Sequence, residues 1–108
     1  EKLAALHVHE KGMKVLEMNR NCPPHGEIDI IALDGDEMVF IEVKTAYKTN
    51  PNMLGEKITQ NKLTRLSHAI QAYQQDTEQI DSFRIDSLFV FLKKNNPMIE
   101  HFKGIHLD

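Results

Sequence analysis

The sequence of 108 residues contains a single cysteine and no long apolar run. Because Cys22 has no partner within the chain, an internal disulfide is excluded, and a cytoplasmic location is expected. No stretch reaches the roughly 20 apolar residues of a membrane span and no signal peptide is visible, so no membrane partner is expected. A chain of this length can bury enough surface to fold as one domain, which we expect to cover residues 1–108.

The chain also lacks an excess of basic residues, since its net charge is −3, and this argues weakly against a nucleic-acid partner. The charges are unevenly distributed, however. Six acidic and no basic residues lie between Glu27 and Glu42, whereas five basic residues and one acidic residue lie between Val43 and Leu66. This distribution is typical of a metal site beside a phosphate track, and ordinary solvated surface charge is the alternative for the basic flank.

The most informative stretch is 26–44, GEIDIIALDGDEMVFIEVK, which predicts a β-hairpin. Strands are expected over 28–33 and 38–44 because both are rich in β-branched and apolar residues, and the DGDE sequence at 34–37 has turn chemistry. One face of the hairpin is expected to be apolar, with Ile28, Ile30, Ala32, Val39, Ile41 and Val43.

The turn residues set which side chains of the other face meet. A type II′ turn centred on Gly35 and Asp36 places Asp29 directly opposite Glu42. A turn centred one residue earlier makes these two carboxylates diagonal neighbours on the same face. In either register, one face of the hairpin gathers Glu27, Asp29, Glu42 and Lys44.

Carboxylates on adjacent strands are the hard oxygen ligands that Mg²⁺ prefers. We therefore expect Asp29 and Glu42 to bind Mg²⁺ or Mn²⁺, with the Val43 carbonyl as a further ligand. Lys44 is expected to orient the attacking water or to stabilise negative charge on a phosphodiester. The alternative is a cross-strand ion pair between Glu27 and Lys44, with both acids solvated on an open sheet face.

The remaining sequence predicts the order α-β-β-β-α-β-β. Helices are expected over 1–11 and from 59 to about 75, and further strands over 13–19, 84–92 and 98–103. A loop is expected over 45–55, and loops of this length are often functional. The strands at 38–44 and 84–92 should be parallel, since a helix connects them. Thr59 is the expected N-cap. The predicted buried stripes are Leu63, Leu66, Ile70 and Tyr73 in the second helix and Leu3, Leu6 and Val8 in the first.

Several residues near the hairpin are candidates for nucleic-acid contacts. Tyr47 is placed to stack on a base, and His25 to act as a pH-sensitive phosphate contact. Apart from such a contact, a surface role is expected for each histidine, including His101. His7 and His9 do not share a helix face, so they make a poor zinc pair. The nucleic-acid-binding candidates are Lys48, Lys62, Arg65, His25 and Tyr47.

The motif G-E-I-D-I-I-A…V-F-I-E-V-K-T resembles the YraN family of small bacterial proteins, which is similar to the PD-(D/E)XK nuclease superfamily. Further matches are Glu1, Ala4, Gly12, Asn19, Gly55, Lys62, Arg84 and Asp86. The resemblance implies an α/β fold of the restriction-endonuclease-like type, with an αβββαβ core and a mixed sheet flanked by helices, in a single nuclease-like domain.

The resemblance also assigns roles to individual residues. Asp29 matches the first metal-binding acid, Glu42 the second, and Lys44 the superfamily's catalytic lysine. Glu1 matches an acid of the first helix that assists metal binding in some members. Lys62 matches a basic position that reaches substrate phosphate, and Glu27 belongs to the GEID signature as a supporting residue.

The sequence therefore predicts a metal-dependent endonuclease that hydrolyses phosphodiester bonds in DNA or structured nucleic acid, with Mg²⁺ or Mn²⁺ as cofactor. Nucleases that cut both strands often dimerise, so a homodimer is an alternative to a monomer. Two other functions stay open: a non-catalytic nucleic-acid-binding module on the same fold, and a protein-interaction adaptor that uses an exposed strand edge at 98–103.

Overall fold

The computed structural model describes residues 2–46, 59–76, 82–92 and 96–105. The elements are α1 (Lys2–Glu10), β1 (Lys14–Asn21), β2 (Glu27–Asp34), β3 (Glu37–Ala46), α2 (Gln60–Asp76), β4 (Phe83–Phe91) and β5 (Met98–Phe102). This order confirms the predicted α/β fold class with an αβββαβ core. The loop predicted from Thr45 begins later than expected because β3 continues to Ala46, and its remainder lies outside the described residues.

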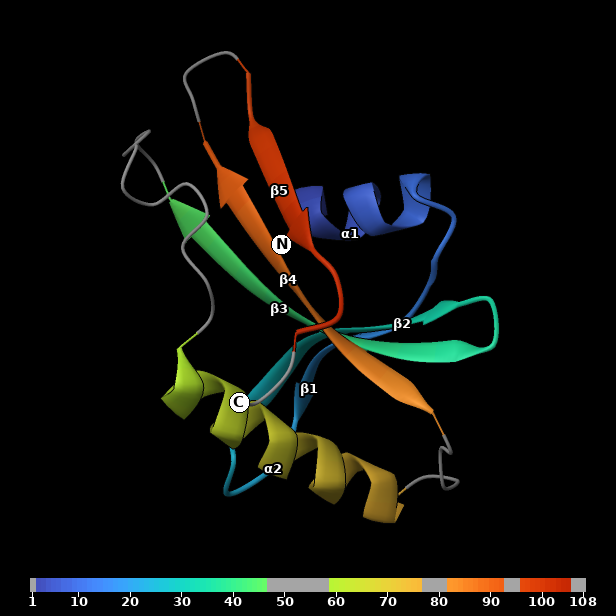
Figure 1. Cartoon of the computed structure of the whole chain (residues 1–108), viewed down its shortest axis with the longest axis vertical. Coiled ribbons are helices and arrows are strands. Elements are labelled where there is room, and N and C mark those ends of the chain that lie inside the picture. The colour runs from blue at the N-terminus through green and yellow to red at the C-terminus, as the bar shows by residue number, and fades with distance from the viewer. Residues whose placement is uncertain (1, 47–58, 77–81, 93–95, 106–108) are drawn as a thin grey trace.

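The five strands form one mixed sheet in the order β1-β2-β3-β4-β5. β3 and β4 are parallel, as predicted, and the other neighbouring pairs are antiparallel. The sheet is strongly twisted, with α1 on one side and α2 on the other (Figure 1). Neither of these two helices is long and apolar enough to span a membrane.

The predicted hairpin is present with the first of the two expected turns. The β2–β3 ladder runs from Asp34 opposite Glu37 to Ile30 opposite Ile41. Gly35 has a φ of 63°, which is the positive angle that a type II′ turn requires at its first central residue. The local turn chemistry therefore sets the register of the two strands.

The sheet is covered by apolar clusters on both faces. One cluster packs under α2 and contains all four residues of its predicted stripe, Leu63, Leu66, Ile70 and Tyr73. Thr59 caps this helix as predicted, since its Oγ1 accepts a hydrogen bond from Lys62 N–H at 3.2 Å. The other cluster packs under α1 and includes Ile30, Ala32, Val39 and Ile41 of the hairpin.

The predicted apolar face of α1 is wrong in part. Ala4 and Val8 are fully buried, whereas Leu3 is 37% and Leu6 is 51% exposed. Ala4 and Val8 are four residues apart and therefore lie on the same side of the helix. Alanine lets the helix backbone come close to the sheet, and the larger leucines are left outside this contact.

Asp86 in β4 is fully buried and ties three segments together. Its carboxylate accepts hydrogen bonds from Arg84 Nε at 3.0 Å, His101 Nε2 at 2.8 Å and Gly104 N–H at 3.1 Å. Burial alone would raise the pKa of Asp86, but these hydrogen bonds lower it below its usual value. His7 Nε2 of α1 lies 3.3 Å from His101 Nδ1, so the network links α1 to β4 and β5.

The surface position predicted for His101 is therefore wrong, since its side chain is only 8% exposed. Its buried partner Asp86 lies in the adjacent strand β4 and is not a sequence neighbour. Because Asp86 is ionised, His101 Nε2 carries a proton, and its Nδ1 accepts from His7 when both rings are neutral.

Lowering the pH is expected to destabilise the folded protein through His7. Burial is the largest cause of the lowered pKa of His7. The positive or partly positive side chains of His101, Lys11 and Lys103 lower it further, and Glu10 raises it. Below the unfolded-state pKa of 6.5, the unfolded chain therefore binds more protons than the folded chain. The free energy of unfolding should fall as the pH drops from above 6.5 through the folded pKa of His7.

Urea denaturation at about pH 8 and about pH 5.5 measures this effect, because the interval spans histidine titration. Wild type should lose more stability over the interval than His7→Gln, by less than about 1 kcal/mol, since the ring is partly exposed and solvent screens its charge. His9→Gln, exposed on the same helix, is the control. Equal losses in wild type and His7→Gln would contradict the assignment.

Candidate functional site

Asp29 lies where the ladder between β2 and β3 ends. Its Oδ2 accepts a hydrogen bond from Val43 N–H at 2.8 Å, just beyond the last ladder pair, Ile30 and Ile41. The Val43 N–H thus fixes the Asp29 carboxylate, and the Val43 carbonyl as a further metal ligand stays a prediction. The expected pairs of Asp29 with Glu42 and of Glu27 with Lys44 are not part of the ladder.

The alternation of side chains in β2 is interrupted at the same place. Ile28 was expected to share a face with Ile30, but Ile28 packs in the cluster under α2 and Ile30 in the cluster under α1. Asp29 is the residue between them, and it bonds to β3 through its carboxylate. The regular pattern of two facing strands therefore stops at this acid.

Glu42 lies on the side of β3 that faces α2, and its side chain is only 16% exposed. Burial, followed by the Asp29 carboxylate, raises the pKa of Glu42, and attraction to Arg65 and Lys62 offsets this only in part. The two acids therefore interact electrostatically. The alternative of an open sheet face with a solvated second acid is wrong for Glu42.

Lys44 follows two residues later and projects from the same side of β3 as Glu42. Its Nζ lies 5.2 Å from the centroid of the Phe89 ring, and Phe89 is its neighbour in the parallel β3–β4 ladder. A cation–π contact of this kind holds the ammonium group over the ring. β3 thus carries an acid and a lysine side by side.

Three predicted nucleic-acid contacts lie within the described residues. Lys62 is exposed in the first turn of α2 and attracts Glu42 electrostatically. His25 precedes β2, and its ring centroid lies 5.3 Å from that of His68 in α2. Sequence reasoning missed His68, because no local pattern shows that it faces the chain before β2. The other candidates, Lys48, Tyr47 and the additional acid Glu1, lie outside the described residues.

Arg65, the third of these contacts, is engaged with the protein itself. Its Nη1 donates to the backbone carbonyls of His25 at 2.9 Å and Glu27 at 3.1 Å, and its Nη2 lies 3.3 Å from Glu42 Oε2. The Glu27 side chain is exposed. Arg65 therefore joins α2 to the start of β2 and to the second acid.

Asp29 and Glu42 form a donor set of the kind that a hydrated Mg²⁺ or Mn²⁺ uses. Across the described ranges, no group of three or more His, Cys, Asp or Glu side chains is placed to hold a metal. Zinc sites usually need three or four such ligands, whereas Mg²⁺ keeps several waters and takes one or two carboxylates. Asp29 and Glu42 satisfy the second requirement.

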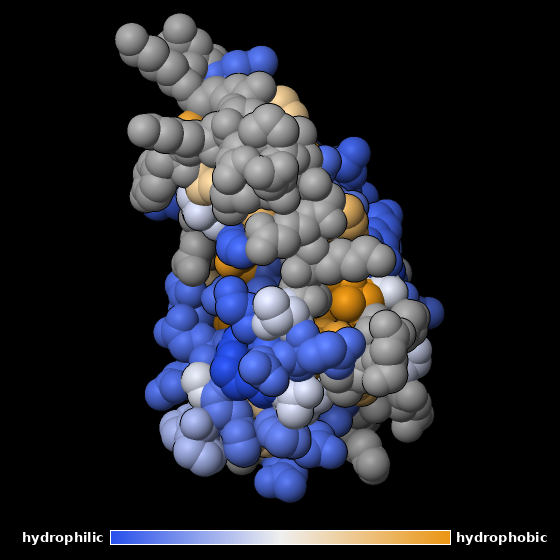
Figure 2. Space-filling view, turned by 60° about the vertical axis from the view of Figure 1, so that its left-hand side comes forward, coloured by the Kyte–Doolittle hydropathy of each residue, from blue (hydrophilic) through white to orange (hydrophobic). Residues whose placement is uncertain are grey.

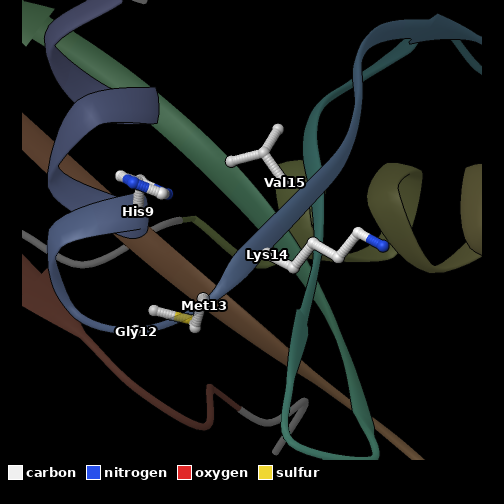
Figure 3. Close-up of a pocket in the computed structure, with 5 residues that line it drawn as sticks. All are labelled: His9, Gly12, Met13, Lys14 and Val15. Carbon is white, nitrogen blue, oxygen red and sulfur yellow. The ribbon is translucent and has the colours of Figure 1, made fainter.

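The surface around α2 is polar. Figure 2 shows hydrophilic residues over the lower half of the molecule, at the height of α2 in Figure 1. A hollow of about 470 Å³ lies elsewhere, where α1 turns into β1 (Figure 3). Its lining residues are His9, Gly12, Met13, Lys14 and Val15. No carboxylate is among these lining residues, so the hollow is separate from the acid pair, Asp29 and Glu42. We assign it no ligand.

Comparison with known proteins places the chain in a family. A protein of Herpetosiphon aurantiacus named "UPF0102 protein" is 33% identical over 113 residues, covering 100% of this chain and 90% of the relative. Proteins of the same name from Arthrobacter sp. and Syntrophus aciditrophicus are 36% and 38% identical, covering 97% and 95% of this chain and 90% and 81% of their own lengths. The family described as "Uncharacterised protein family UPF0102" matches residues 1–90. The chain therefore belongs to this family, the YraN family that its hairpin motif resembles.

Proposed function

We propose that this protein is a metal-dependent nuclease of the PD-(D/E)XK type, which hydrolyses phosphodiester bonds in DNA or a structured nucleic acid. The observation that carries the proposal is that Asp29 bonds to the backbone of Val43, the residue after the largely buried Glu42, at the end of the β2–β3 ladder. Holding a largely buried carboxylate beside a second one costs stability, and such perturbed acids are typical of functional sites. A divalent cation between them would relieve this repulsion.

Each residue of the site has a separate part in the proposed reaction. Mg²⁺ or Mn²⁺, when bound, supplies a Lewis acid and lowers the pKa of a coordinated water. Asp29 and Glu42 would hold the ion, and the Val43 N–H fixes the orientation of the Asp29 carboxylate. The Lys44 ammonium stabilises the negative charge that builds on the phosphoryl oxygens. Lys62 attracts the flanking phosphates.

The contact between Arg65 and Glu42 favours one alternative, a nucleic-acid-binding module without catalysis. The guanidinium already places a positive charge beside the second acid, at 3.3 Å. In such a module, this contact would be purely structural and no cation would be needed. Binding of nucleic acid would then have the same salt dependence with and without Mg²⁺.

Cleavage assays separate these two functions. Purified protein is incubated with single-stranded, duplex and branched DNA and with RNA, in Mg²⁺, in Mn²⁺ or in EDTA. The nuclease should cut at least one substrate with metal and none in EDTA, and Lys44→Ala should slow cleavage by about 100-fold or more. Binding without cleavage of any substrate in either metal would refute the nuclease.

A further inference from the structure

The guanidinium of Arg65 is held by acceptors from two separate segments. Two of them are the backbone carbonyls of His25 and Glu27, both bound by Nη1, and the third is Glu42 Oε2, which faces Nη2. The first two belong to the chain that enters β2 and the third to β3. One planar group thus spans the two strands that carry the acid pair.

Gly26 makes this arrangement possible. It lies between the two carbonyls with a φ of 85°, and a Cβ atom built on it would lie 2.9 Å from Arg65 Nη1. A side chain at this position would displace the guanidinium. The chain before β2 is therefore shaped around Arg65.

We propose that Arg65 is a positioning residue for the acid pair, and this inference rests on the proposed metal-dependent function. By binding the Glu27 carbonyl, it fixes the start of β2, two residues before Asp29. By binding Glu42, it orients the second carboxylate. Arg65 thereby fixes the separation of the Asp29 and Glu42 side chains, although β2 and β3 are no longer paired at these two residues.

The geometry requires a guanidinium and not merely a positive charge. Arginine presents several donors in a rigid planar fork, whereas the ammonium group of lysine is a compact charge on a flexible stem. Lysine at position 65 would keep the charge but would not bridge acceptors on both nitrogens. Outer partners of metal ligands typically contribute 10–100-fold to metal affinity, which sets the expected effect at roughly that range.

Titration of Mn²⁺ into wild type, Arg65→Met and Arg65→Lys tests the inference. Both variants should bind Mn²⁺ about 10–100-fold more weakly than wild type at a temperature where all three are folded. A residue that only stabilises the fold would lower the thermal midpoint without changing metal affinity below it. Affinities within about twofold of wild type in both variants would overturn the inference.

Gly26→Ala and Gly12→Ala form a matched pair that leaves Arg65 in place. The two glycines have similar φ angles of 85° and 88°, so both substitutions carry similar backbone strain. No atom lies within 4 Å of a Cβ on Gly12. Only Gly26→Ala should therefore weaken Mn²⁺ binding. Equal affinity in the two alanine variants would overturn the inference even if Arg65→Met does not fold.

The same titration keeps the two proposals apart. If wild type binds Mn²⁺ and the Arg65 and Gly26 variants bind it equally well, the positioning role fails and the metal site stands. If wild type binds no Mn²⁺, the metal-dependent function fails, and the positioning role fails with it.

Discussion

Replacing Glu42 by glutamine is expected to abolish metal-dependent cleavage without destabilising the metal-free protein. Glutamine has nearly the same shape but lacks the charge that holds a divalent cation. Loss of an outer partner of a metal ligand already costs 10–100-fold, so loss of the ligand itself should reduce cleavage by more than about 100-fold. Rates measured on the best substrate, at a Mn²⁺ concentration that saturates wild type, would show this.

The stability of Glu42→Gln follows from the raised pKa of Glu42. Between 4.5 and that raised pKa, the folded chain binds more protons than the unfolded chain, so the free energy of unfolding falls as the pH rises. At neutral pH the carboxylate is therefore a cost to the fold, which glutamine removes. Urea denaturation without metal should find Glu42→Gln at least as stable as wild type. A large loss of stability would instead identify Glu42 as a structural ion-pair partner of Arg65.

Replacing Asp86 by alanine is expected to cause a large loss of stability. Leaving a buried donor without its acceptor costs about 1–3 kcal/mol for each group, and Asp86→Ala removes the acceptor of both His101 Nε2 and Gly104 N–H. Asp86 is fully buried and accepts from Arg84, His101 and Gly104. Domains are stable by only about 5–15 kcal/mol, so this variant should unfold at a much lower urea concentration.

Asp34→Ala is the control for the Asp86 variant. Asp34 also bonds to Arg84, at 2.8 Å, but its side chain is 40% exposed. Exposed ion pairs contribute about 0–1 kcal/mol, so this substitution should change the urea midpoint little. Similar losses in the two variants would contradict the assignment of Asp86 as the buried centre of the network.

The hairpin and the second helix could be predicted from the sequence because local features determine them. The Gly35-Asp36 turn sets the register of β2 and β3, and the spacing of apolar residues sets the buried face of α2. Each of these features needs only residues that are close in the chain. The positions of Glu42 and Lys44 on one side of β3 could be predicted for the same reason.

The predictions failed where a small residue or a distant partner decides the outcome. Ala4 brings α1 close to the sheet, whereas a count of large apolar residues had favoured Leu3 and Leu6. His101 is buried through Asp86 in the neighbouring strand.

Arg65 in the candidate site also has partners that the sequence could not show. Its basic side chain on a helix beside acidic strands is the pattern of a phosphate contact. Its actual partners are two backbone carbonyls about 40 residues earlier and one carboxylate. Residue types do not show which backbone carbonyls accept hydrogen bonds. Gly26 was the one local signal, since a glycine at the start of the motif allows another group to approach closely.

Calorimetric titration of Mn²⁺ into the metal-free protein tests the central claim most directly. Wild type should bind Mn²⁺ in a saturable way, Asp29→Asn and Glu42→Gln should lose this binding, and Glu10→Gln, exposed on α1, should bind like wild type. Equal binding by all four proteins would contradict a site at Asp29 and Glu42, and so would the absence of binding by wild type up to about 10 mM Mn²⁺.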